Sequence, residues 1–463
     1  MPIPGEDFLA RISPLLTPAP GAWLDDLVAV NFDTVALLEW GQYDPKREYV
    51  KQAGNALIRF DPLGKVIWQK NIQLCLPDGR CLFGWQDATL LRTHDGFLVV
   101  GTSPSLPESW LGVVAARFKE DGTVMWVKHY RGLMETGVED GEAIGVAHIN
   151  GLASDLFLIA AKFGRSSVFF QIDGVGNFVA GTAYRIDDFV VKRLRDTATQ
   201  GIFALGAHWS ESWTGRPYMV CIDPTSGYPR WERIYSTAIP PRYPDLTGPV
   251  WYDIAEGADC LMALANATSD TVPYIGYIVR LEKDTSGNPG AVTWARLAPV
   301  EFAYGCFWSI VNFQYEPVPL KEQEGSGTAT SSSFAVGGML PRFYDAAWLF
   351  RMGEDGKIFW EKMYSETNFP IDRLIWPSYS QIVAGSTILG DPNNAMVVSS
   401  RPDPGIGRLF CAKEPATSFV DVEMSSELRQ SGRIPIDIAT NPWSYRTVDP
   451  LPIAFGCLQG APR

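Results

Sequence analysis

The sequence has few of the residues, and none of the short motifs, that usually mark an enzyme. Its 463 residues include four histidines, and no two of these have the spacing of metal ligands. It contains no Gly-x-Ser-x-Gly elbow, no phosphate-binding glycine loop and no His-Glu-x-x-His motif. We therefore expect a non-enzymatic protein rather than an enzyme, although the sequence alone leaves that question open.

Basic residues and long apolar segments are scarce as well. The 39 Lys and Arg residues are outnumbered by 52 Asp and Glu residues, which gives a net charge of -13. A nucleic-acid-binding surface is not expected, because such a surface needs a concentration of basic side chains. No segment approaches the ~18 consecutive apolar residues of a membrane-spanning helix, so the sequence predicts none.

Neither the first residues nor the cysteines decide the compartment. Met1–Asp7 lack the basic and apolar regions of a secretory signal, which leaves the cytoplasm, an assembled particle, or the cell exterior after signal removal. Seven cysteines leave at least one unpaired. Cys75 and Cys81 flank a Pro-Asp-Gly turn that makes a disulfide between them one alternative, and Cys411–Cys457 is the second candidate pair.

One pattern recurs along almost the whole chain. An apolar strand is followed by a turn that contains Asp and Gly and then by a strand centred on a large aromatic residue, first at residues 56–68. These aromatic residues, which we call anchors, are Trp68, Trp126, Phe178, Trp231, Trp294, Trp360 and Phe410. They lie 50 to 66 residues apart, which suits a unit of about four antiparallel strands joined by turns.

The apolar strands upstream of the anchors predict how the units pack. Runs such as Phe97–Val100 and Leu156–Ala161 are nearly continuous rather than alternating, which is typical of strands covered on both faces. A four-stranded sheet with two apolar faces needs neighbours, and seven such sheets can bury these faces around a common axis. The sequence therefore predicts an all-β fold, a seven-bladed β-propeller of four-stranded antiparallel blades with a non-repeat C-terminal extension.

Three segments fall outside the repeat. We expect residues 1–22 to form an N-terminal lead-in that contains a single helical turn at Phe8–Ile12. The propeller then occupies residues 23–411, and residues 412–463 form a C-terminal extension packed on the propeller or on a partner. Lys321–Ser333 reads as a polar, low-complexity loop between two strands of the sixth unit.

Within each unit, the strand that carries the anchor is expected to be the outermost. An outermost strand needs protection from pairing with other chains, and charged side chains provide it. We assign this protective role to the basic residues that stand two positions after five of the anchors, namely Lys70, Lys128, Arg233, Arg296 and Lys362.

The repeat resembles that of bacterial β-propeller proteins and, in its Asp-x-x-x-Gly-x-x-x-Trp spacing, the tryptophan-docking repeat of quinoprotein-like (PQQ-like) propellers. Asp223–Trp231 is the best match, and the resemblance covers about residues 23–411. It implies a propeller, which is a fold that hosts enzymes, lectins and scaffolds. Quinoprotein enzymes carry a vicinal cysteine pair, whereas no two cysteines are adjacent here, so the resemblance does not extend to a bound quinone.

A polar residue stands near the start of the predicted innermost strand of each unit. The set consists of Asp26, Asp87, Glu142, Asp188, Asp253 and Asp372, with Ser309 in the sixth unit. If these strands line the axis, the carboxylates approach one mouth of the channel, where they could bind Ca2+ or a polar ligand. In the simpler interpretation, which we prefer, each carboxylate accepts hydrogen bonds from nearby backbone N–H groups.

Two functions from different classes follow from these residues. Trp85, Trp251 and Trp308 stand close to the axial carboxylates, and aromatic rings beside carboxylates are typical of sugar-binding sites. The alternative function is therefore a carbohydrate-binding or carbohydrate-active propeller, a lectin or a glycosidase. The leading hypothesis is a non-enzymatic propeller that binds another protein as a structural component of a larger assembly.

Overall fold

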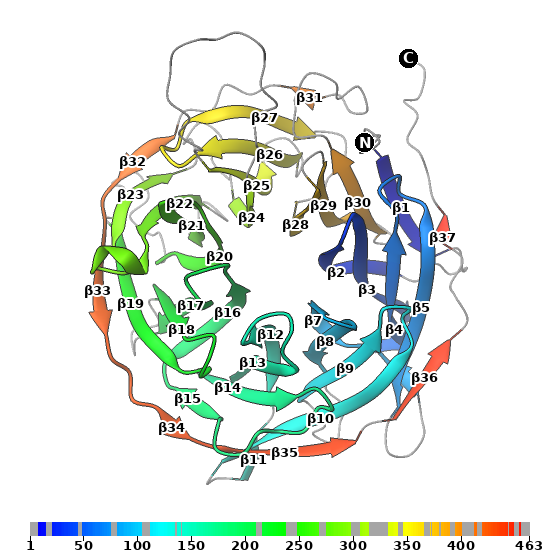
Figure 1. Ribbon diagram of the computed structural model, residues 1–463. Helices are drawn as coiled ribbons and strands as arrows, with labels where there is room; N and C mark the ends of the chain where they lie inside the picture. The colour runs from blue at the N-terminus through cyan, green and yellow to red at the C-terminus, as the bar shows by residue number, and fades with distance from the viewer. Residues whose placement is uncertain are drawn as a thin grey trace.

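Seven antiparallel sheets surround a central axis in the computed structural model, like the blades of a propeller (Figure 1). The all-β fold and the seven blades predicted from the repeat are thus confirmed. The structure describes residues 8–14, 21–44, 49–75, 81–103, 112–134, 137–139, 141–209, 215–237, 248–267, 275–297, 306–313, 332–340, 346–364, 371, 373–378, 381–388, 394–400, 412–413, 419–442, 444–448 and 453–454.

The first four blades follow one another along the chain, each starting at the axis and ending at the rim. The first contains β2 (Gly21–Val30), β3 (Asp33–Asp44), β4 (Tyr49–Phe60) and β5 (Val66–Cys75), with β6 (Cys81–Phe83) paired to β5. The second contains β7 (Gln86–Thr93), β8 (Gly96–Thr102), β9 (Val113–Lys119) and β10 (Val124–Met134), with β11 (Gly137–Glu139) paired to β10. The third contains β12 (Glu142–Ile149), β13 (Leu156–Phe163), β14 (Ser166–Asp173) and β15 (Tyr184–Ile186). The fourth contains β16 (Phe189–Asp196), β17 (Ile202–Trp209), β18 (Gly215–Ile222) and β19 (Pro229–Thr237).

The last three blades complete the ring. The fifth contains β20 (Val250–Glu256), β21 (Cys260–Ala267), β22 (Ile275–Glu282) and β23 (Val292–Leu297), with the short 3-10 helix η1 (Asp284–Ser286) before β23. The sixth contains β24 (Cys306–Phe313), β25 (Ser333–Leu340), β26 (Ala346–Gly353) and β27 (Ile358–Tyr364). The seventh contains β28 (Arg373–Ser378), β29 (Gln381–Ile388), β30 (Asn394–Ser400) and β1 (Phe8–Pro14). No helix in the described segments is long and apolar enough to span a membrane.

The position of β1 corrects two expectations about the N-terminus. Phe8–Pro14 forms a strand and not a helical turn, and it pairs antiparallel with β30 as the fourth strand of the seventh blade. Residues 8–14 therefore belong to the propeller instead of leading into it. Because this strand comes from the other end of the chain, it closes the ring with backbone hydrogen bonds. Phe410, the anchor assigned to the seventh unit, lies outside the described residues.

The C-terminal segment encircles the propeller as a belt, shown in orange and red in Figure 1. It adds a fifth strand to the outer edge of every blade, visiting the sixth blade first, then the fifth down to the first, and finally the seventh. Its strands are β31 (Ala412–Lys413), β32 (Val420–Val422), β33 (Met424–Arg429), β34 (Ile434–Pro435), β35 (Asp437–Pro442), β36 (Ser444–Val448) and β37 (Ile453–Ala454). The expectation that the anchor strands are outermost is therefore wrong.

The blades pack through both of their faces, as the continuous apolar runs predict. In β8 and β21 every residue is buried, and the clusters of buried side chains span neighbouring blades. Trp231 packs against a cluster that includes Trp251 and Leu261 of the next blade. The anchor Phe178 also packs inward, although it forms an isolated bridge with Ile172 while β15 supplies the outer strand of its blade.

Four of the tryptophan anchors, Trp68, Trp126, Trp231 and Trp294, reach the glycine-containing turn of the following blade. Gly176 has a φ of 78°, and a Cβ added there would lie 2.9 Å from the Trp126 ring, so only glycine lets the ring approach. Trp126 also donates a hydrogen bond from Nε1 to the Gly174 carbonyl oxygen, at 2.9 Å. Gly122, Gly290 and Gly356 receive the anchors of the preceding blades in the same way.

Four of the basic residues that follow the anchors, Lys70, Lys128, Arg233 and Arg296, serve the same contact, and the side chain of Lys362 lies outside the described residues. The Lys128 ammonium donates to Asn177 Oδ1 in the next blade at 2.7 Å, and Arg296 Nη1 donates to the Asp355 carbonyl at 3.1 Å. Since the belt already covers the rim, the expected protective role is wrong for these residues.

Candidate functional site

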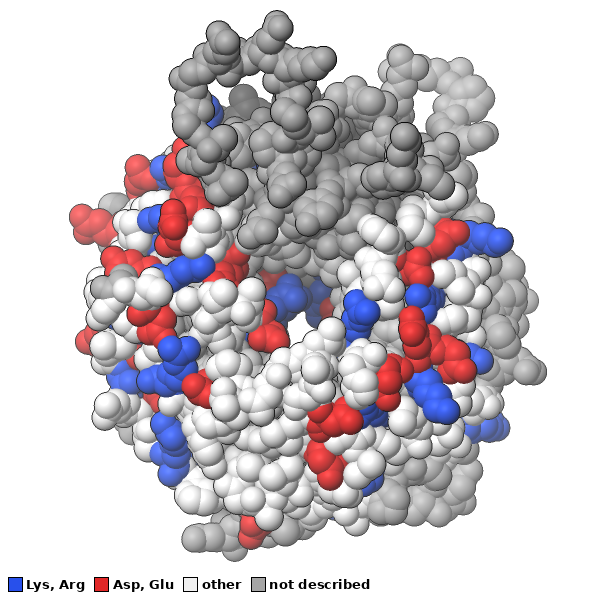
Figure 2. Space-filling view, viewed as in Figure 1, with Lys and Arg blue, Asp and Glu red and all other residues white. Residues whose placement is uncertain are grey.

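A cavity of about 380 Å³ lies where the seven innermost strands face the axis. All seven strands, β2, β7, β12, β16, β20, β24 and β28, contribute lining residues. Figure 2 shows the hollow at the centre of one face, with Lys or Arg atoms inside it. The central position makes this cavity the candidate functional site, because it is the one place that all seven blades share.

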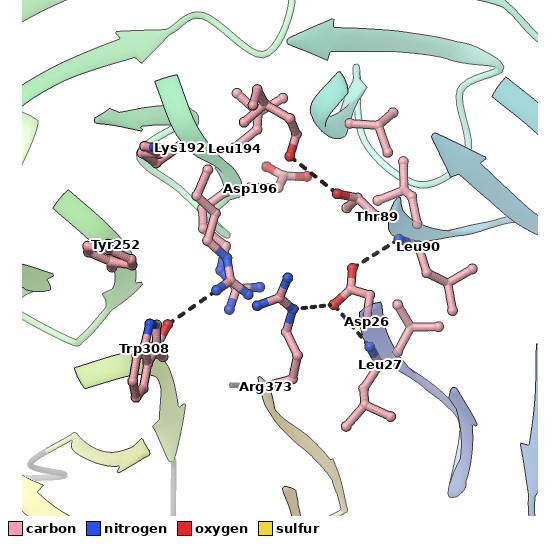
Figure 3. Close-up of a pocket in the computed structure, with 16 residues that line it drawn as sticks. Asp26, Leu27, Thr89, Leu90, Lys192, Leu194, Asp196, Tyr252, Trp308 and Arg373 are labelled. Carbon is pink, nitrogen blue, oxygen red and sulfur yellow. Dashed lines mark hydrogen bonds and ion pairs between the residues drawn. The ribbon is translucent and has the colours of Figure 1, made fainter. Parts of the chain in front are cut away.

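The two sides of the cavity differ in chemistry (Figure 3). Strands β2, β7 and β12 contribute mainly apolar residues, among them Val28, Leu91 and Val146. Strands β16, β20, β24 and β28 contribute most of the polar ones, which are Lys192, Arg193, Arg195, Asp196, Tyr252, Trp308 and Arg373. The cavity is therefore amphipathic, with a cationic side opposite an apolar side.

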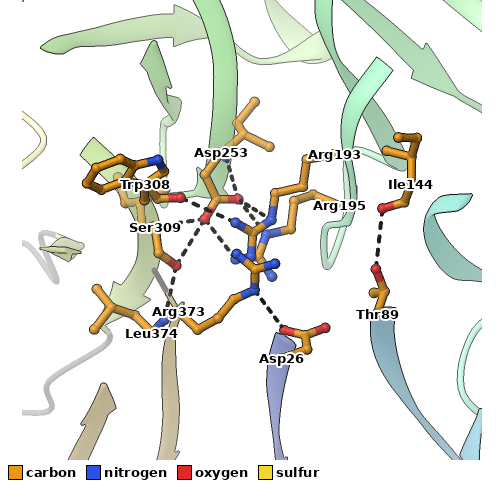
Figure 4. Close-up of polar contacts among 12 residues, drawn as sticks. Asp26, Thr89, Ile144, Arg193, Arg195, Asp253, Trp308, Ser309, Arg373 and Leu374 are labelled. Atoms are coloured by element: carbon orange, nitrogen blue, oxygen red, sulfur yellow. Dashed lines mark hydrogen bonds and ion pairs between the residues drawn. The ribbon is translucent and has the colours of Figure 1, made fainter. Parts of the chain in front are cut away.

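Asp253 organises the cationic side from a fully buried position on β20 (Figure 4). Its two carboxylate oxygens accept hydrogen bonds from Arg195 Nε at 2.5 Å and Nη2 at 2.8 Å, and Arg193 Nε lies 3.5 Å away. Burial by itself raises the pKa of Asp253, but Arg193 and Arg195 outweigh it and hold that pKa below the ordinary value. Asp253 is therefore an ionised partner of two arginines.

Asp253 and Asp26 also join neighbouring blades through the backbone. Asp253 accepts N–H bonds from Ile254 on its own strand and from Ile310 on the next blade, at 3.0 and 2.9 Å. Asp26 does the same with Leu27 and Leu90, both at 2.9 Å, and accepts from Arg373 Nε at 3.2 Å. These carboxylates thus hold one blade against the next.

Ser309 and Asn55 make comparable contacts between blades. Ser309 Oγ accepts the Leu374 N–H at 3.0 Å and donates to Asp253 Oδ2 at 3.2 Å. Asn55 accepts the Trp85 N–H and donates to the Trp85 carbonyl oxygen. Single polar side chains, Ser309 on an innermost strand and Asn55 on β4, therefore fix the relative position of neighbouring blades.

The other described carboxylates of the predicted axial set, Asp87, Glu142 and Asp188, make no hydrogen bond or ion pair with the arginines around Asp26 and Asp253. Asp87 and Asp188 are exposed and have left-handed φ values of 49° and 56°. Glu142 is exposed and forms an ion pair with Lys162 at 3.0 Å, and Asp372 lies outside the described residues. The described residues contain no group of three or more His, Cys, Asp or Glu side chains placed to hold a metal ion.

The three tryptophans expected near the axial carboxylates lie in two different environments. Trp85 and Trp251 are completely buried between blades, where Trp251 packs edge-to-face on Tyr235. Trp308 lines the central cavity, and its carbonyl oxygen accepts a hydrogen bond from Arg193 Nη1 at 3.2 Å. Only the third of these rings can therefore meet a ligand in the cavity.

Two further carboxyl groups near the axis have raised pKa values. Burial and the nearby charge of Asp87 raise the pKa of Glu39 to about 7. Burial, followed by the charge of Glu39, raises the pKa of Asp25 well above its ordinary value. Asp25 accepts a hydrogen bond from Asn55 Nδ2 at 3.3 Å, so it takes part in the contact between the first two blades.

The cysteines add no reactive group to the described part of the site. Cys75 is disulfide-bonded, and Cys81 stands opposite it in the register of β5 and β6. Cys221 and Cys260 are free and buried, and burial raises the pKa of each thiol to about 12, so both thiols stay protonated. Cys411 and Cys457 lie outside the described residues.

Sequence reasoning overlooked the arginines that dominate the cavity. Arg193 and Arg195 belong to the run Lys192-Arg193-Leu194-Arg195-Asp196, and Arg373 directly follows Asp372, one of the predicted residues. A cluster of cations on a predicted innermost strand is unusual, because most of that strand is buried. This run of basic residues is the signal in the sequence that identifies the cationic side.

Comparison with known proteins assigns neither a family nor a function to this chain. The chain matches no protein-family profile and no curated protein. Among solved structures it is similar to the β-propeller domain of Nup133 from Vanderwaltozyma polyspora, at 11% sequence identity and a TM-score of 0.38, over 81% of this chain and 100% of that domain. A likeness at this level says nothing about function.

Proposed function

We propose that this protein is a non-enzymatic propeller that binds another protein as a structural component of a larger assembly. The main support for this proposal is the distribution of exposed apolar side chains over the surface. In an antiparallel blade, the turn between the first and second strands and the turn between the third and fourth lie at the same end. The ends of all seven blades that carry these turns form one face of the disc, which we call the short-turn face.

Among the described residues, the exposed large hydrophobic side chains outside the belt lie at these turns. They are Phe32, Leu63, Ile67, Met125, Leu152, Val175 and Phe359. Ile67, Met125 and Phe359 each precede a tryptophan anchor and stand at a register shift of the anchor strand, where a β-bulge leaves the residue without a partner on the neighbouring strand. Phe32 and Val175 are 62% and 60% exposed. Apolar residues gathered on one face favour a protein partner over a face that only meets water.

The carbohydrate alternative has less support. It rests on tryptophan rings beside carboxylates at the axis, and Trp85 and Trp251 are too buried to stack on a sugar. Two carboxylates at the cavity, Asp26 and Asp253, are already paired with arginines. The likeness of the repeat to quinoprotein-like propellers stays a prediction from the sequence, and it adds nothing to either function.

The test is to purify the full chain from its own host and to measure the masses of its complexes by native mass spectrometry. We expect a stoichiometric complex that the double variant Ile67→Glu/Met125→Glu loses. The control, Arg216→Glu, adds negative charge at an exposed residue on the opposite face and should keep the complex. A solitary monomer, or a complex that survives the double variant, would count against the proposal.

A further inference from the structure

The charge inside the central cavity is opposite to that of the whole chain. The chain carries a net charge of -13, yet four cationic residues line the cavity, namely Lys192, Arg193, Arg195 and Arg373. Asp26 and Asp196 also line it, and Asp253 lies buried behind the arginines. Cations therefore outnumber carboxylates by four to three within a confined space, where charges are weakly screened.

The hydrogen bonds of Asp26 and Asp253 leave some arginine N–H donors without a carboxylate acceptor. Asp26 and Asp253 each accept two backbone N–H bonds, so much of their acceptor capacity goes to the backbone. A guanidinium group has five N–H donors, and with the described residues Arg193 makes one hydrogen bond, from Nη1 to the Trp308 carbonyl oxygen, and one ion pair, from Nε to Asp253. Arg195 directs Nε and Nη2 at Asp253, which leaves its Nη1 donors for a ligand.

Two further observations point to an excess of positive charge. The exposed Lys192 ammonium makes no hydrogen bond or ion pair with any described residue, although it borders the cavity. Burial, together with the charges of Arg195 and Arg373, lowers the pKa of Arg193 to about 9. An anion placed among these groups would relieve their repulsion and occupy the remaining N–H donors.

We propose that the central cavity binds a small organic anion that carries a carboxylate or phosphate group. The acidic group lies against Arg193, Arg195 and Lys192, and the apolar body lies against Val28, Leu91 and Val146 on the opposite side. A cavity of about 380 Å³ is within the size range of small-molecule sites and is larger than a single anion needs. The proposal does not depend on a protein partner.

The test uses isothermal titration calorimetry on the full chain with probes that separate charge from shape. Benzoate and phenyl phosphate combine an acidic group with an apolar ring, acetate and inorganic phosphate supply the acidic group alone, and benzamide is a neutral match for benzoate. We expect at least one ring-bearing anion to bind with a Kd below about 1 mM and at least tenfold more tightly than its ring-free counterpart. Benzamide should not bind.

Two variants locate the binding. Arg193→Gln should weaken the best probe at least tenfold, and Lys192→Gln should weaken it several-fold without loss of an internal contact. Lys65→Gln, which removes an exposed lysine from a turn away from the cavity, should leave the affinity unchanged. The proposal is overturned if no anion binds, if benzamide binds as well as benzoate, if the ring adds no affinity, or if Lys192→Gln and Arg193→Gln bind like the wild type.

Discussion

The axis and the rim of this propeller are held together by different kinds of contact. At the axis, single side chains such as Asp26 and Asp253 accept N–H bonds from the next blade, and arginines balance their charge. At the rim, the belt joins the blades through backbone pairing, and in β33 the last three side chains are all exposed. The axis therefore depends on the identity of a few buried residues, whereas the rim depends on the continuity of one chain.

This difference predicts what each region tolerates. Replacing a buried charge at the axis leaves its partners unpaired in the interior, which is costly. Replacing one exposed belt residue leaves the backbone pairing intact. Removing the belt as a whole uncovers strand edges all around the disc, and uncovered edges pair with other chains.

The largest effect is therefore expected from deletion of the belt. Without residues 412–463, we expect most of the protein to leave the monomer peak in size-exclusion chromatography with light scattering and to form associated species. The control deletion removes residues 455–463 alone, keeps every belt strand through β37, and should remain monomeric. If the chain without its belt stays monomeric and equally stable, the belt is not what protects the rim.

The propeller could be predicted from the sequence because each unit repeats a strong local signal. Continuous apolar strands such as Phe97–Val100 must be covered on both faces, and anchors such as Trp126 recur with an Asp–Gly turn. The belt gives no such signal. Met424–Arg429 pairs along one edge and buries little, so it has neither an apolar run nor a clear alternation.

The closure of the ring and the composition of the central cavity could not be predicted from the sequence, for related reasons. Phe8–Pro14 completes a blade whose other strands lie almost 400 residues later, and no local pattern encodes that pairing. Asp26 and Asp253 lie on innermost strands, but the sequence predicts carboxylates around them, whereas the structure places arginines there. Their arginine partners come from other strands, which a single-strand pattern does not connect.

The second largest effect is expected at Asp253. Asp253→Asn removes the charge that balances Arg193 and Arg195 in the interior, and it should lower the free energy of unfolding in urea by about 3–5 kcal/mol at pH 7. The matched control is Asp421→Asn on the belt. Asp421 also pairs with an arginine, Arg296, at 2.9 Å, but its side chain is 82% exposed, so we expect a loss below about 1 kcal/mol.

The pH dependence of the stability lost in Asp253→Asn tests whether the lost contribution is one of charge. The pKa of Asp253 is lower in the folded protein than the unperturbed value of 3.8, so its stabilisation is present above that value and is lost as the pH falls through the folded pKa. The difference between wild type and Asp253→Asn should therefore be constant near neutral pH and shrink in acid. A difference that persists unchanged at low pH would mean that packing, and not charge, is lost in the variant.

The smallest of these effects concerns the contact between an anchor and the next blade, which lies one strand inside the belt. Gly176 and Gly181 both have a φ of 78°, but a Cβ at Gly176 meets the Trp126 ring at 2.9 Å, whereas one at Gly181 meets nothing within 4 Å. Gly181→Ala should cost about 1 kcal/mol of unfolding free energy for backbone strain alone. Gly176→Ala adds displacement of the ring and should cost about 2–3 kcal/mol. Equal losses in the two variants would show that the anchor contributes little to holding the blades together.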